Sequence, residues 1–122
     1  MKRLHAYALG GIFAAAMLAA PLAAAHAGIQ KSTPAANAML VAAPPEIVLT
    51  FNEKIESAFS SITLTDANGK SIGAAKARID ASDPVTLRLA APALSSGMYS
   101  VQWIAVGHDG HRRTGKFKFT VK

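Results

Sequence analysis

The side chains best suited to metal chemistry belong to the tripeptide Asp109-Gly110-His111, near the end of the chain. Asp109 and His111 are two positions apart, so in an extended segment both side chains project to the same side, within reach of one ion. A carboxylate and an imidazole are a suitable ligand pair for a divalent transition metal. The tripeptide is also typical of a hairpin turn with a solvated histidine. His108, next to Asp109, is expected to point the other way.

A further candidate ligand, His26, follows a segment with the features of a secretory signal peptide. Residues 1–25 open with Lys2 and Arg3, continue through an alanine- and leucine-rich stretch and end in the small-residue run Ala23-Ala24-Ala25. A retained membrane anchor is the alternative, because about 20 apolar residues span a bilayer, although alanine is only weakly apolar. We therefore expect residues 1–25 to be cleaved and the mature protein to be exported.

The position of cleavage decides whether His26 is a ligand. Cleavage after Ala25 would make His26 the first residue, whose free α-amine and ring Nδ1 can close a six-membered chelate on one metal. Such an amine titrates near enough to neutral pH for a metal to displace its proton. Ala25-His26-Ala27 also has the A-x-A pattern, and cleavage after Ala27 would remove His26. Both positions stay open from these residues alone.

Together, the candidate ligands make a donor set of three nitrogens and one oxygen. The amine and imidazole of His26, the carboxylate of Asp109 and the imidazole of His111 suit tetragonal Cu(II), and zinc could use the same ligands tetrahedrally. Cu(I) prefers several sulfur ligands held together. Met39 and Met98 are distant in sequence, and we expect them to fill gaps in the core. The sequence thus favours one Cu(II) site.

The composition argues against several other functions. The chain has 122 residues, which is room for one domain, and no cysteine, so it offers neither a disulfide nor a thiol. Its 13 Lys and Arg residues outnumber 7 Asp and Glu, but they are scattered and do not indicate nucleic-acid binding. Nucleophile motifs and phosphate-binding glycine loops are missing from the sequence, so we do not expect an enzyme.

Apolar and polar residues alternate with a period of two along most of the chain, which is typical of strands with one buried face. The clearest runs are residues 47–51, 62–64, 85–89, 99–105 and 117–121. Segments rich in Gly, Pro, Asn and Asp separate these runs and favour tight turns. A helical period is not evident after residue 25.

This pattern predicts an all-β fold, a Greek-key β-sandwich or barrel that is cupredoxin-like or immunoglobulin-like, with about seven strands. The strands include a short one near Ile29 and another over residues 74–79. Trp103 lies at an apolar position of its run and is expected in the core. Thr86 lies at a polar position of its run and is expected on the solvated face.

Several segments together resemble one protein family. They are a mature chain that begins with His26, the segment Ser32-Thr33-Pro34-Ala35, the stretch Pro44 to Glu53, a strand with Trp103, the Asp109-Gly110-His111 loop and Gly115-Lys116-Phe117-Lys118-Phe119. The combination is similar to the CopC family of periplasmic copper-binding, copper-resistance proteins and spans nearly all of residues 26–122. Some members carry a methionine-rich loop for Cu(I), which this sequence lacks.

The resemblance implies a periplasmic β-sandwich domain over residues 26–122 that binds Cu(II) through His26, Asp109 and His111. It also supports cleavage after Ala25, because the distance from His26 to Pro34 fits the family pattern. We expect a monomeric copper carrier or chaperone for copper resistance or homeostasis, without catalysis of its own. An inner-membrane copper transport protein of the CopD type is the implied partner.

Two other functions are compatible with parts of the sequence. A histidine-brace copper oxidase would also use an N-terminal histidine, but the chain shows no extended aromatic platform for a polymer substrate. A metal-free, immunoglobulin-like interaction module becomes the better hypothesis if cleavage follows Ala27. Oxidase activity with copper and a reductant would separate the first alternative from the carrier, and N-terminal sequencing would separate the second.

Overall fold

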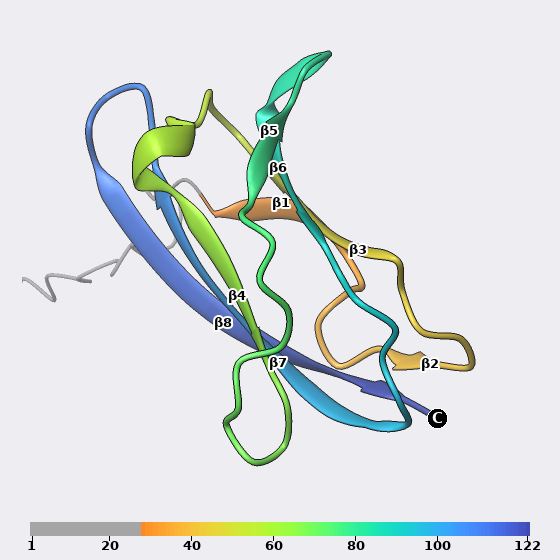
Figure 1. Ribbon diagram of the computed structural model, residues 1–122. Coiled ribbons are helices and arrows are strands. Elements are labelled where there is room, and N and C mark those ends of the chain that lie inside the picture. Colours follow the sequence, from red (N-terminus) through yellow and green to blue (C-terminus); the bar gives the residue numbers. More distant parts are fainter. Residues whose placement is uncertain (1–27) are drawn as a thin grey trace, which may run out of the picture.

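The computed structural model describes residues 28–122, which form two four-stranded sheets (Figure 1). The expected signal peptide, residues 1–25, and His26 lie outside the described residues. The first sheet has the order β1 (Ile29–Thr33), β3 (Glu46–Phe51), β6 (Asp83–Ala90) and β5 (Arg78–Asp80). The second has the order β2 (Met39–Leu40), β8 (Arg112–Val121), β7 (Gly97–Val106) and β4 (Ser61–Thr65).

The predicted all-β sandwich is confirmed, and the chain crosses repeatedly from one sheet to the other. The described residues contain eight strands rather than about seven. The additional strand, β2, has two residues that pair in parallel with Thr120 and Val121 of β8. Two residues are too few to show a period, so only the tertiary pairing reveals this strand. A short 3-10 turn, η2 (Ser57–Phe59), is the one helical element of the described region.

Alternating apolar residues of both sheets meet in a single core. In β3, Ile47, Leu49 and Phe51 are almost fully buried, while the residues between them are partly exposed. Trp103 of β7 is only 8% exposed, which confirms its predicted place in the core. Its indole packs edge to face against the Phe51 ring with 5.2 Å between the ring centroids, which is a favourable aromatic geometry.

Thr86 departs from the predicted alternation. The alternation places Thr86 on the solvated face, but only 3% of this residue is exposed. Its hydroxyl donates to Asp83 Oδ2 at 2.8 Å and lies 3.2 Å from the hydroxyl of Thr50 on the neighbouring strand. The prediction is wrong because these hydrogen bonds satisfy the hydroxyl and allow its burial.

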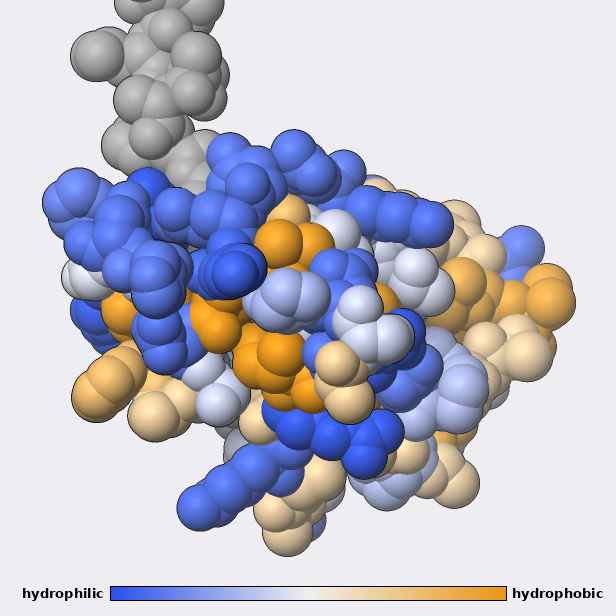
Figure 2. Space-filling view, turned by 90° about the horizontal axis from the view of Figure 1, so that it is seen from above, coloured by the Kyte–Doolittle hydropathy of each residue, from blue (hydrophilic) through white to orange (hydrophobic). Residues whose placement is uncertain are grey.

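One end of the sandwich carries the loop between β7 and β8, residues 107–111, together with the η2 turn. An isolated bridge between Ile55 and Gly107 and the bond from the Glu56 N–H to the Val106 carbonyl hold the two segments together. Hydrophilic side chains cover much of the surface at this end, and hydrophobic areas lie at its centre and along one side (Figure 2). This polar end presents the loop with the candidate ligands.

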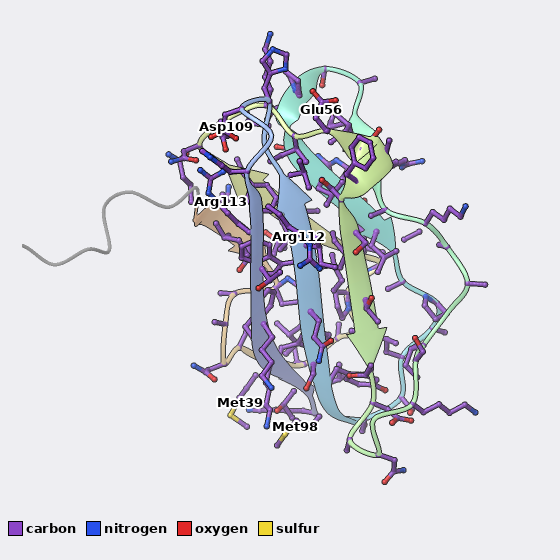
Figure 3. The ribbon with its side chains drawn as sticks, turned by 90° about the vertical axis from the view of Figure 1, so that its left-hand side faces the viewer. Met39, Glu56, Met98, Asp109, Arg112 and Arg113 are labelled. Carbon is purple, nitrogen blue, oxygen red and sulfur yellow. The ribbon has the colours of Figure 1, made fainter. Side chains whose placement is uncertain are left out.

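The opposite end exposes the two methionines. Met39 is 65% exposed and Met98 is 49% exposed, so the prediction that they fill gaps in the core is wrong. Thr120 of β8 is the pairing partner of both residues, and the two methionines therefore flank β8 on one face of the sheet (Figure 3). The sequence does not predict that the two methionines are close, because they are far apart along the chain and come together only through the pairing of their strands with β8.

Replacing Gly115 with alanine should destabilise the fold by about 1–3 kcal/mol, the usual cost of overpacking. Gly115 lies opposite Trp103 in the β7–β8 ladder, and a Cβ there would lie 2.5–2.8 Å from three atoms of the indole. Urea unfolding measures the change. The exposed neighbour Thr114→Ala is the matched control and should change stability by less than about 0.5 kcal/mol. Equal stability of the two variants would contradict the close packing of Trp103 on Gly115.

Candidate metal centre

The loop between β7 and β8 is a tight turn rather than an extended segment. The N–H of Gly107 donates to the carbonyl of His111 at 3.1 Å, and the N–H of Gly110 donates to the carbonyl of Gly107 at 2.9 Å. Gly110 has a φ of 81°, a left-handed conformation that glycine adopts at little cost. The glycine between the two candidate ligands therefore serves the turn.

Asp109 and His111 are in direct contact. The backbone N–H of His111 donates to Asp109 Oδ1 at 3.0 Å, which is an Asx turn, and Asp109 Oδ2 lies 2.9 Å from His111 Nδ1. The two side chains meet because of this turn and not because of the strand alternation on which the prediction relied. Nδ1 of His111 faces the carboxylate, and the other ring nitrogen, Nε2, does not. The His111 side chain as a whole is 76% exposed.

Arg113 connects this pair to a second carboxylate. Its Nη1 donates to Glu53 Oε1, and its Nη2 lies 3.4 Å from Asp109 Oδ2. The guanidinium is largely covered, with a side chain that is 16% exposed. Glu53 and Arg113 are 60 positions apart, so no local spacing could have revealed this contact, and sequence reasoning missed both residues.

Gly107 makes room for these carboxylates. A Cβ at this position would overlap the carboxylate of Glu53 and would lie 2.9 Å from Asp109 Oδ1. The first glycine of the loop thus allows both acidic side chains to approach the backbone closely. The sequence could have pointed to Gly107, because this glycine immediately precedes His108 and Asp109 in the same loop.

The hydrogen bonds to Asp109 favour its ionised form. Its pKa is lowered, mainly because the backbone N–H of His111 donates to the carboxylate. Partial burial opposes this effect, while the His111 imidazole and the Arg113 guanidinium add to it. A carboxylate that is already ionised can bind a cation without first losing a proton.

His108 lies apart from the pair. Its Nδ1 is 3.1 Å from Glu56 Oε1, and its side chain is largely exposed. The backbone N–H of His108 donates to the carbonyl of Lys54 at 3.0 Å, which anchors this side of the loop to the segment after β3. The second loop histidine therefore faces the η2 side of the end surface, and only His111 accompanies Asp109.

The first described strand begins at the same end of the sandwich as the loop. Ile29 of β1 pairs with Phe51 at the end of β3, and Glu53 follows two residues later and contacts Arg113. Figure 3 shows Arg113 and Asp109 at this end. Within residues 28–122, no three His, Asp or Glu side chains lie close enough together to hold a metal ion. The two predicted ligands in this region form a pair, and His26 is outside it.

These features define a class of protein: a small β-sandwich whose hairpin loop presents a carboxylate–imidazole pair beside its N-terminal strand. The CopC domain model matches residues 29–122, and the chain belongs to this family. The membership confirms the family resemblance that the sequence motifs indicated. Along the described part of the chain, none of the helices is long and apolar enough to cross a membrane.

Three similar proteins illustrate the relationship. Copper resistance protein C of Pseudomonas syringae pv. tomato is 39% identical over 117 residues, which are 91% of this chain and 92% of that protein. Protein YobA of Escherichia coli K12 is 37% identical over 106 residues, 86% of each chain. The crystal structure of CopC from Methylosinus trichosporium OB3b has a TM-score of 0.75 at 35% identity and covers 80% of this chain and 94% of that one.

Proposed function

We propose that this protein is a periplasmic copper carrier that binds one Cu(II) ion for copper resistance or homeostasis. The observation that carries the proposal is the Asp109–His111 contact on an exposed, polar loop. Membership in the CopC family and the name of the Pseudomonas syringae relative support copper as the cargo. The proposed ligands are the amine and imidazole of His26, the carboxylate of Asp109 and the imidazole of His111.

The start of β1 supports the participation of His26. His26 precedes Ile29 by three residues, and an extended chain spans roughly 3.3–3.6 Å per residue, or about 10 Å in all. Ile29 pairs with Phe51, and Glu53 follows Phe51 by two residues. Glu53 in turn contacts Arg113, which also contacts Asp109 of the loop. A mature chain that begins at His26 thus has the length to bring its amine toward Asp109.

The contacts of the loop suggest a role for each ligand atom. For Asp109 and His111 to bind the same ion, the contact between His111 Nδ1 and Asp109 Oδ2 has to open, because an ion on Nε2 would otherwise lie on the far side of the ring from the carboxylate. Asp109 receives contacts from the His111 N–H, the His111 ring and Arg113. A carboxylate has about four lone-pair positions, so one is left for the metal.

The remaining parts of the proposal concern processing and partners. We propose cleavage after Ala25, export to the periplasm and a monomeric mature protein without catalysis of its own. An inner-membrane copper transport protein of the CopD type is the proposed partner. The intact mass of the exported protein tests the cleavage, since a chain that begins at Gly28 would lack His26 and would favour the metal-free interaction module.

Titration of the exported protein with Cu(II) should reach saturation at one equivalent, and adding a reductant should release the metal. Met39 and Met98 lie near each other, but the recess that they share offers Asn37 and Lys118 rather than a third sulfur. Cu(I) prefers several soft ligands, so two thioethers alone should hold it weakly. Copper retention after reduction is measured by gel filtration and metal analysis.

The matched control is the double variant Met39→Leu, Met98→Leu, which keeps the apolar volume. It should bind Cu(II) as the parent protein does. Tight, stoichiometric retention of Cu(I) that the double variant abolishes would contradict the single Cu(II) site. Turnover of a polysaccharide with copper and reductant would instead support the oxidase alternative.

A further inference from the structure

The two sheets differ in how their charges are compensated. In the first sheet, Arg88 is paired with Glu46 and with Asp80, each at 2.7 Å. The strands of the second sheet contain no Asp or Glu at all. β8 nevertheless carries Arg112, Lys116 and Lys118 as exposed residues, and none of the three forms an ion pair within residues 28–122.

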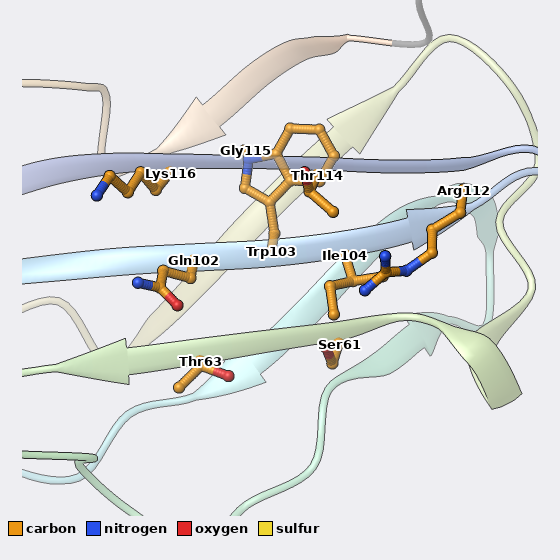
Figure 4. Close-up of a pocket in the computed structure, with 9 residues that line it drawn as sticks. All are labelled: Ser61, Thr63, Gln102, Trp103, Ile104, Arg112, Thr114, Gly115 and Lys116. Atoms are coloured by element: carbon orange, nitrogen blue, oxygen red, sulfur yellow. The ribbon is translucent and has the colours of Figure 1, made fainter.

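The outer face beside these cations is hollowed, and none of the described residues that line the hollow is Asp or Glu. A recess of about 390 Å³ lies over β4, β7 and β8 (Figure 4). Arg112 and Lys116 stand at its two ends, and the polar side chains of Ser61, Thr63 and Gln102 line it between them together with the apolar side chain of Ile104. Arg112 and Lys116 are four positions apart, or about 13 Å along a strand. A ligand that meets both cations must therefore be extended.

Part of one edge of β8 has no strand partner within residues 28–122. The Lys118 carbonyl accepts the N–H of Asn37, and the Thr120 N–H donates to the Ala38 carbonyl, so these alternate residues face the edge that β2 covers. By the same alternation, Arg112, Thr114 and Lys116 direct their N–H and carbonyl groups to that edge beyond the end of β2. β7 pairs with the other edge of this stretch, but among residues 28–122 no strand pairs with the edge to which these three residues direct their groups.

We propose that the stretch from Arg112 to Lys116 binds an acidic, extended segment of a partner polypeptide, which adds to β8 as a further strand. The backbone groups along this edge suit a polypeptide, because strand addition supplies matching N–H and carbonyl groups. The cations then select carboxylates at alternate positions of the added strand. A second copy of the same edge would place like charges opposite one another, which is unfavourable. The proposed surface begins directly after His111 but contains none of the proposed copper ligands.

The test uses the copper-free mature protein and two synthetic eight-residue peptides. One alternates Glu with Thr or Val, and the other has Lys in place of each Glu. We expect only the acidic peptide to bind, with an affinity that falls as salt is added. Hydrogen exchange should slow at the amides of Arg112, Thr114 and Lys116, because an added strand accepts hydrogen bonds from them. Faster or unchanged exchange at these amides would overturn strand addition.

The double variant Arg112→Glu, Lys116→Glu should weaken binding of the acidic peptide by about tenfold or more, since two cross-strand attractions become repulsions. The near-ultraviolet signal of the buried Trp103 verifies that the variant is folded. The matched control is Lys70→Glu in an exposed turn, which should bind as the parent protein does. An equal loss in both variants would overturn the proposal.

A polyanion without a peptide backbone distinguishes recognition of negative charge from recognition of a peptide strand. Tripolyphosphate presents negative charge but no strand, so it should bind more weakly than the peptide and should leave the three amides unprotected. If tripolyphosphate binds as tightly as the peptide, the surface recognises negative charge alone and the proposed polypeptide partner is wrong.

Discussion

A chain with one extra residue before His26 should bind Cu(II) at least about a hundredfold more weakly than the exported protein. The added residue converts the α-amine into an amide, which removes one donor and opens the six-membered chelate. Even the loss of a group that only supports a ligand costs tenfold to a hundredfold in metal affinity, so the loss of a donor should reach that range or exceed it. Competition against a chelator of known affinity measures the effect.

The control for this extension is a chain with the same residue added after Lys122. The last strand, β8, ends at Val121, at the end of the sandwich opposite the loop, so the added residue lies far from the site. Its Cu(II) affinity should equal that of the exported protein. If the N-terminal extension also leaves the affinity unchanged, the amine is not a ligand. An exported protein that starts at Gly28 would rule out the proposed site altogether.

The second large effect concerns the two loop histidines. Replacing His111 with alanine should lower the Cu(II) affinity tenfold to a hundredfold, whereas replacing His108 should lower it much less. The structural reason is that His111 contacts Asp109, while His108 contacts Glu56 on the other side of the loop. Both side chains are similarly exposed, so the two variants form a matched pair that differs mainly in position.

Electron spin resonance of the Cu(II) forms distinguishes the two histidines independently of affinity. The spectrum of the His111→Ala variant should lose the contribution of one imidazole, and the spectrum of His108→Ala should keep it. The reverse outcome would assign the ligand to His108. Because Asp109 accepts the backbone N–H of His111 at 3.0 Å, and that bond survives the substitution, the loop itself should keep its turn.

Much of the fold follows from local pattern. The alternation in β3 and β7 predicts which residues are buried, because adjacent side chains of a strand face opposite sides of the sheet. The same rule fails at Thr86, where a hydroxyl finds partners in the interior. The prediction for Met39 and Met98 fails for a different reason, because it relied on side-chain type alone. Met98 lies out of phase with the buried residues of β7, and Met39 lies in the two-residue edge strand β2.

The candidate site also has one part that local sequence predicts and another that depends on the tertiary structure. The sequence by itself determined the Asp109–His111 pair, because two residues in one tight turn are neighbours whatever the rest of the chain does. The sequence also determined that His26 precedes Ile29, at the start of β1, by three positions. Only the tertiary structure decided that Glu53 and Arg113 join the pair, since 60 positions of chain separate them and only the packing of β3 against the β7–β8 hairpin brings them together. Contacts between distant segments depend on the whole fold, whereas a turn depends on its own few residues.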